Sequence, residues 1–120
     1  MTYPLPDQEF RSFLEDGRFM IQRGASSGRY IFYPRVAEPG SGAQDLEWVQ
    51  ASGGGEIYAV TVVHPKPPAK PYNVVLVTLD EGPRMMSRVD ADLASVKIGC
   101  RVRARIAEID GSPNVVFDLE

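Results

Sequence analysis

The 120-residue sequence contains one cysteine and one histidine, so the side chains that most often ligate metals or act as nucleophiles are scarce. Cys100 alone can form neither an intramolecular disulfide nor a cysteine metal cluster, and we interpret it as a small core residue rather than a nucleophile. His64 has no Asp or Ser neighbour in the sequence to orient or activate it. A hydrogen-bonding or partner-contact role is therefore favoured over general base catalysis. The sequence predicts no catalytic set.

Long apolar runs and an excess of positive charge are also absent. No segment approaches the roughly 18 apolar residues needed to cross a bilayer. The segment 1–7 is neither basic nor apolar, so no secretory signal is readable and we expect a cytoplasmic protein without membrane contact. The net charge of −3 weighs against nucleic acid, because such binding relies on neutralising phosphates.

The N-terminal region predicts one helix. Phe10, Phe13 and Leu14 stand at i, i+3 and i+4, which indicates an amphipathic helix over 7–18 that ends near Gly17. The prolines before it favour an extended N-terminal arm that frays in an isolated chain. The region 1–20 is therefore interpreted as arm and helix.

A hairpin-like appendage is predicted next, over 21–45. This region is rich in Gly, Ser and Pro, and its one strand-like piece is 29–34. From residue 46 onward the pattern is β throughout, with Val- and Ile-rich segments separated by Gly or Pro. These segments are 46–51, 56–64, 72–80, 83–89, 101–109 and 114–119, with a turn or short helix at 90–97.

Short strands in this number predict a small barrel. The glycines 53–55 precede a strand with two largely apolar faces, as expected of a strongly curved first strand. The segment 90–97 would close the barrel between its third and fourth strands. The sequence predicts a mainly β fold, a five-stranded OB-fold barrel over 46–120.

An ordered series of short motifs carries a family resemblance across about residues 10–117. The sequence resembles the bacterial and archaeal acyl-CoA-associated proteins (domain of unknown function family 35), which join an N-terminal helix and a rubredoxin-like zinc ribbon to an OB-fold. The motifs are Gln22-Arg23, Pro34-Arg35, 45–48, 52–55, Tyr58 with Thr61, 77–82 with Arg84, and Ile98-Gly99 with Val102.

The resemblance implies four former zinc-ligand positions, Gly24, Ser27, Glu38 and Ser41. A structural zinc site uses thiolate or imidazole ligands, and this set contains neither. We therefore predict a degenerate, metal-free ribbon without zinc.

Two interpretations of the metal-free ribbon stay open. The segment 22–44 is either a flexible surface loop or an ordered ribbon in which packing replaces the folding energy of the metal. The apolar side chains available for this packing, against the barrel, the helix or a partner, are Tyr30, Phe32, Tyr33 and Trp48.

The resemblance also implies a role. We expect a non-catalytic accessory subunit of a thiolase-like complex, including lipid-transfer-type thiolases and aldolases, that helps bind or position an acyl-CoA thioester. The catalytic Cys and His would belong to the partner, and no cofactor would be bound permanently. The alternatives are a free-standing acyl-CoA or lipid-binding module and an OB-fold nucleic-acid-binding protein. The candidate contacts to acyl-CoA or the partner are Arg35, Trp48, His64, Lys66, Arg84 and Arg88.

Two arginine arrays need an interpretation: Arg84 with Arg88 on the 83–89 strand, and a second array on the 101–109 strand. Arg101, Arg103 and Arg105 alternate on one strand and so share a face. We interpret them as a solvent face with acidic partners on neighbouring strands, rather than as a site for the phosphates of coenzyme A. A single-stranded nucleic acid would need exposed aromatics between the arginines, and neither the 101–109 strand nor the 83–89 strand carries one. The loop 64–72, with four prolines and two lysines, is either a stiff partner surface or an ordinary barrel loop.

Overall fold

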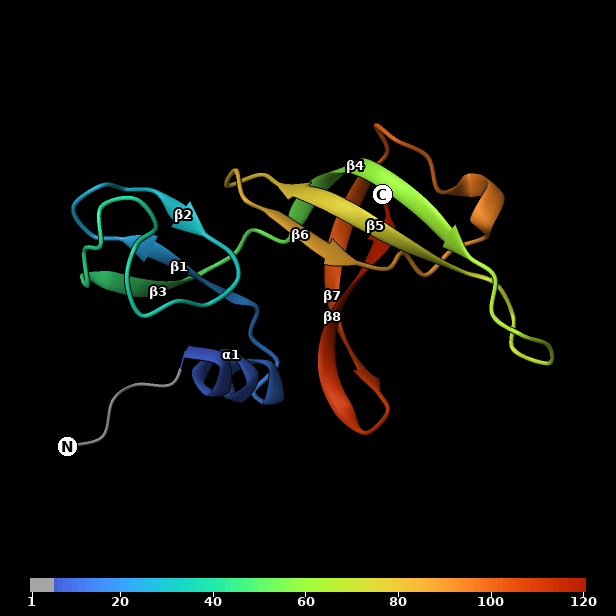
Figure 1. Cartoon of the computed structure of the whole chain (residues 1–120), viewed down its shortest axis with the longest axis horizontal. Helices are drawn as coiled ribbons and strands as arrows, with labels where there is room; N and C mark the ends of the chain where they lie inside the picture. The colour runs from blue at the N-terminus through green and yellow to red at the C-terminus, as the bar shows by residue number, and fades with distance from the viewer. Residues whose placement is uncertain (1–5) are drawn as a thin grey trace.

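The computed structural model describes residues 6–120 and contains one helix, a small sheet and a larger curled sheet (Figure 1). Helix α1 spans Pro6–Glu15. The small sheet has the order β2-β1-β3, from β1 (Met20–Gly24), β2 (Tyr30–Ile31) and β3 (Leu46–Gln50). The predicted arm lies, apart from Pro6, outside the described residues. Between residues 6 and 120 no helix is long and apolar enough to span a membrane.

The helix ends at Glu15, three residues before the predicted end. Gly17 donates its N–H to the Leu14 carbonyl at 2.9 Å, and Arg18 donates its N–H to the Phe13 carbonyl at 2.9 Å. This pair of bonds is a Schellman motif, and Gly17 has the positive φ (77°) that it requires. Gly17 therefore ends the helix as predicted.

The larger sheet has five antiparallel strands in the order β6-β5-β4-β7-β8. Its two outer strands meet through a parallel bridge between Val89 and Phe117. Phe117 donates its N–H to the Arg88 carbonyl at 3.0 Å, and Asp90 donates to the Phe117 carbonyl at 2.8 Å. The sheet thus curls into the OB-type barrel that the sequence predicts. Its strands are β4 (Gly54–Val63), β5 (Tyr72–Leu79), β6 (Arg84–Ser87), β7 (Arg101–Ile109) and β8 (Ser112–Leu119), with the short 3₁₀ helix η1 (Leu93–Ser95) between β6 and β7.

The strand at residue 46 differs from the prediction. The sequence predicts that the barrel starts at residue 46. In the structure β3 pairs instead with β1, with Ile21 opposite Val49 and Gln22 opposite Trp48. It therefore belongs to the small sheet, and the larger sheet begins at Gly54. Strand propensity does not specify the pairing partner, so the sequence pattern could not assign β3 to a sheet.

The start of β4 is crowded, which explains its glycines. A Cβ atom on Gly55 would lie 2.6 Å from Cγ1 of Val77 and 3.0 Å from the Thr78 carbonyl oxygen. Further along, the register shifts between Ile57 and Ala59, so the strand carries a bulge. Together these features produce the curved first strand that the sequence predicts.

The core fills the barrel interior. Ile57, Val75, Val77, Val102 and Phe117 are each at most 1% exposed. On β5 every second side chain points inward, as the period of a strand requires. Leu14 and Phe19 extend the same core beneath the helix.

Asn73 is a buried polar residue that fastens the end of β6 to β5. Its side chain donates to the Val89 carbonyl at 2.9 Å and accepts the Val89 N–H at 2.8 Å. We expect Asn73→Ala to lower the free energy of unfolding by about 1–3 kcal/mol, because the buried Val89 N–H loses its acceptor and the Val89 carbonyl keeps only the Ala91 N–H. Urea unfolding measures this change. The exposed Asn114, which bonds only the nearby Ser112 carbonyl, is the control: Asn114→Ala should stay within about 0.5 kcal/mol of the parent, and equal losses would contradict the assignment.

Candidate functional site

Aromatic packing holds the small sheet against α1. The Trp48 ring lies 5.2 Å from Phe13 and 6.4 Å from Phe10, measured between centroids. Phe10 also meets Phe32 at 5.6 Å. The Trp48 indole donates to Glu9 Oε2 at 2.7 Å. Of the aromatic side chains named in the sequence analysis, Trp48 and Phe32 pack against the helix, whereas Tyr33 reaches the barrel through its hydroxyl. Trp48, predicted as a contact residue, is half-buried in this packing.

The four positions that the resemblance implies as zinc-ligand positions lie together, and we name them the Glu38 cluster: Gly24, Ser27, Glu38 and Ser41. Ser41 Oγ donates to Glu38 Oε2 at 2.7 Å, and Ser27 Oγ donates to Glu38 Oε1. Glu38 is only 5% exposed. A Cβ atom on Gly24 would lie 2.7 Å from Glu38 Oε1, so the glycine leaves the space that the carboxylate fills.

The Glu38 cluster does not fit a zinc ion. It offers one carboxylate, whose oxygens already accept two hydroxyl hydrogens, and neither thiolate nor imidazole. Over residues 6–120 no group of three His, Cys, Asp or Glu residues is placed to hold a metal. The hydrogen bonds from Ser27 and then Ser41 hold the pKa of Glu38 below its ordinary value, against the opposing effect of burial.

Two further motif residues, Gln22 and Arg35, are joined by two hydrogen bonds. Gln22 is 5% exposed; its side chain donates to the Arg35 carbonyl at 2.7 Å and accepts the Arg35 N–H at 2.6 Å. The motifs Gln22-Arg23 and Pro34-Arg35 therefore join through the backbone of Arg35. The Arg35 side chain is exposed.

The outer surface of β4, β5 and β6 carries what we name the arginine–tyrosine face: Tyr58, Tyr72, Arg84, Met86 and Arg88. The Arg84 guanidinium carbon lies 3.8 Å from the Tyr58 ring centroid, and that of Arg88 lies 5.5 Å from the Tyr72 centroid. Tyr58 is 52% exposed and Met86 58%. Within residues 6–120 neither arginine forms an ion pair; Arg84 donates only to Thr78 Oγ1, at 3.3 Å.

Sequence reasoning missed these aromatic partners. The 83–89 strand carries no aromatic, but neighbouring strands place Tyr58 and Tyr72 beneath its arginines. The prediction that no aromatic side chain accompanies the arginines is therefore wrong for Arg84 and Arg88. Strand pairing was the missing information, because the pairing decides which residues share a face.

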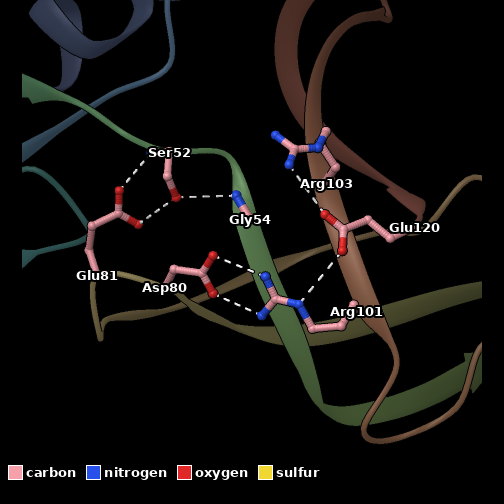
Figure 2. Close-up of polar contacts among 7 residues, drawn as sticks. All are labelled: Ser52, Gly54, Asp80, Glu81, Arg101, Arg103 and Glu120. Carbon is pink, nitrogen blue, oxygen red and sulfur yellow. Dashed lines mark hydrogen bonds and ion pairs between the residues drawn. The ribbon is translucent and has the colours of Figure 1, made fainter.

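The arginine array of β7 is paired with acidic side chains, as predicted, and Figure 2 shows the pairs of Arg101 and Arg103. Arg101 binds Asp80 through two bonds of 2.8 and 3.0 Å, and Arg103 contacts Glu120 at 3.3 Å. Arg105 pairs with Asp118 at 2.9 Å and Asp90 at 3.0 Å. The hydrogen bonds from Arg101 lower the pKa of Asp80, and those from Arg105 lower that of Asp118. These three arginines therefore each have an acidic partner, as Arg84 and Arg88 do not among residues 6–120.

Two contacts fix the small sheet to the barrel. In Figure 2, Glu81 of the β5–β6 turn accepts the Ser52 N–H at 2.6 Å, which anchors the linker after β3. The Tyr33 hydroxyl accepts the Met86 N–H at 3.3 Å. The segment that carries Arg35 thus lies beside the arginine–tyrosine face.

The remaining predicted residues are on the surface or half-buried. His64 and Lys66 are exposed in the loop between β4 and β5, which leads into Tyr72. Arg84 and Arg88 thus lie on the same face of the sheet, each against its own tyrosine, and the loop leads into this face at Tyr72. Cys100 is half-buried against the core, with Sγ 3.9 Å from the Ser95 carbonyl.

Comparisons with known proteins establish the family. Residues 48–107 match the family model described as the C-terminal OB-fold domain of ChsH2. A DUF35 domain-containing scaffold protein of Pyrococcus furiosus is 31% identical over 116 residues, which cover 90% of this chain and 85% of that protein. The chain belongs to the DUF35 family.

Solved structures extend the likeness of this DUF35 chain over its whole length. A chain of the Ltp2-ChsH2(DUF35) aldolase is similar with a TM-score of 0.84 and 27% identity, covering 99% of this chain and 98% of that one. A DUF35-family protein of unknown function from Sulfolobus solfataricus shares the fold, with a TM-score of 0.70, 13% identity, and coverage of 94% and 84%. The probable enoyl-CoA hydratase alpha subunit of Thermomonospora curvata is 37% identical over 75 residues, 60% of this chain and 24% of that protein.

Proposed function

We propose that this DUF35 protein is a non-catalytic accessory subunit of a thiolase- or aldolase-type complex that acts on acyl-CoA thioesters. The observation that carries the proposal is the whole-chain likeness to a chain of the Ltp2-ChsH2(DUF35) aldolase. The relative described as a scaffold protein supports the same role. So does the chemistry of the described residues, where the exposed His64 and the half-buried Cys100 lie on separate elements without an activating partner.

We assign the arginine–tyrosine face to contact with acyl-CoA or with the partner subunit. Its two arginines lack acidic partners among residues 6–120, whereas the three arginines of β7 are all paired. A guanidinium that stacks on a ring keeps its N–H edge available for a phosphate or a carboxylate. His64 and Lys66 adjoin this face through the loop that leads into Tyr72, and Arg35 adjoins it through Tyr33.

Co-expression with a thiolase-like protein encoded in the genomic neighbourhood tests the proposal. We expect a stable complex, and we expect Arg84→Glu with Arg88→Glu to weaken the complex or its acyl-CoA binding by about tenfold or more. Co-purification measures the first property and calorimetry with acyl-CoA the second. Arg11→Glu with Lys97→Glu is the control, because it changes the net charge equally at exposed positions outside the face.

Other outcomes of these measurements favour other functions. Acyl-CoA binding by the chain alone, without complex formation, would support a free-standing acyl-CoA-binding module. The stacked arginine–tyrosine pairs are the observation that favours single-stranded nucleic acid. Salt-dependent binding of an oligonucleotide at physiological ionic strength would support that third function over the accessory role.

A further inference from the structure

The two turns of the Glu38 cluster have the same backbone hydrogen bonds. Gly28 donates its N–H to the Gly24 carbonyl at 2.8 Å, and Gly42 donates to the Glu38 carbonyl at 2.9 Å. Both closing glycines have a left-handed φ, 73° and 72°. Each turn thus reverses the chain, and Ser27 of the first turn bonds Glu38 of the second.

The serines of the two turns are also equivalent. Ser27 Oγ accepts the Arg29 N–H at 3.2 Å, and Ser41 Oγ accepts the Ala43 N–H at 3.3 Å. Each hydroxyl then donates its own hydrogen to one oxygen of Glu38. Each serine thus connects a backbone N–H of its own turn to the same buried carboxylate, which accepts two of these four hydrogen bonds.

We infer that the Glu38 carboxylate joins the two turns at the position where a ribbon would hold a metal, so that ionised Glu38 closes the ribbon and protonated Glu38 opens it. The polarity of the site is reversed: a metal centre is a cation surrounded by electron-pair donors, whereas this centre is an anion surrounded by hydrogen-bond donors. A protonated carboxyl donates its hydrogen to one serine hydroxyl, so that hydrogen bond reverses direction and both serines lose the charged acceptor that makes their bonds strong.

Two charged residues act on Glu38 from the surrounding segments. Arg29 favours the ionised form, and Asp45 opposes it. Asp45 is itself satisfied by Ser26, whose backbone N–H donates to it at 3.0 Å. The pKa of Glu38 lies below its ordinary value of 4.5, so its stabilising contribution is present above that pH and is lost as the pH falls through the lowered pKa.

Hydrogen exchange of the full chain tests the inference through the amides of Arg29 and Ala43. At pH 7 we expect Glu38→Gln to reduce the protection factors of both amides on the order of tenfold, because a neutral amide replaces the charged acceptor of the two serine hydroxyls and its NH₂ can only donate. Glu108→Gln, an exposed change on β7, should leave them unchanged. Core amides such as that of Val77 report global unfolding and should stay protected in both variants.

The same experiment separates the possible outcomes. Ser27→Ala and Ser41→Ala each remove one donor, and each should lower the protection of both turns. As the pH falls below 4.5, the parent and Asp45→Asn should lose this protection, whereas Glu38→Gln should show no further change. Parental protection in Glu38→Gln, or a loss of protection in the parent on adding a metal chelator, would overturn the inference.

Discussion

A variant with cysteine at all four positions of the Glu38 cluster is expected to bind stoichiometric zinc. The changes Gly24→Cys, Ser27→Cys, Glu38→Cys and Ser41→Cys place four thiols on two turns that already converge. A structural zinc site contributes about 10–16 kcal/mol of apparent binding free energy at neutral pH, so the melting temperature should depend strongly on chelator. Elemental analysis and thermal unfolding with and without EDTA measure both effects.

Two comparisons make this result interpretable. The parent chain should carry no stoichiometric zinc and should melt at the same temperature with and without chelator. Gly24→Cys alone should be destabilised, because its Cβ would lie 2.7 Å from the carboxylate oxygen that remains. If the four-cysteine chain folds and takes up no zinc, the two turns do not have the geometry of a metal site.

Replacing Trp48 by alanine is expected to lower the free energy of unfolding by about 3 kcal/mol, the lower end for removal of a large aromatic side chain. The ring contacts Phe10 and Phe13, and its N–H bonds Glu9, so its loss removes a large part of the packing between α1 and the small sheet. Urea unfolding measures the change.

Trp48→Phe is the matched control, because it keeps an aromatic ring while it loses the bond to Glu9 and one ring of the indole. We expect a cost of about 1 kcal/mol from that bond. A Trp48→Ala chain with parental stability that no longer joins the thiolase-like complex would instead restore Trp48 as a contact residue.

The sequence predicted local structure well where one segment carries the whole signal. The end of α1 at Gly17 follows from one glycine that can adopt a positive φ. The bend at the start of β4 follows from the adjacent glycines of 53–55, of which Gly55 has no space for a side chain. The barrel follows from the spacing of its apolar strands.

Features that depend on pairing between distant segments could not be predicted. The assignment of β3 to the small sheet rests on its register with β1, which leaves no mark in the sequence of either strand. The tyrosines beneath Arg84 and Arg88 likewise arrive from neighbouring strands. The sequence indicates that position 38 carries no cysteine, but the hydrogen bonds from the two serines to Glu38 are evident only from the structure.

The bond between Tyr33 and Met86 has a consequence for self-association. An outer strand offers unpaired N–H groups to the strands of other molecules, which is a common route to aggregation. At β6 the Met86 N–H is already occupied by a hydroxyl 53 residues away in the sequence. The ribbon therefore protects this edge, and a chain without its ribbon would leave β6 free to pair with strands of other copies.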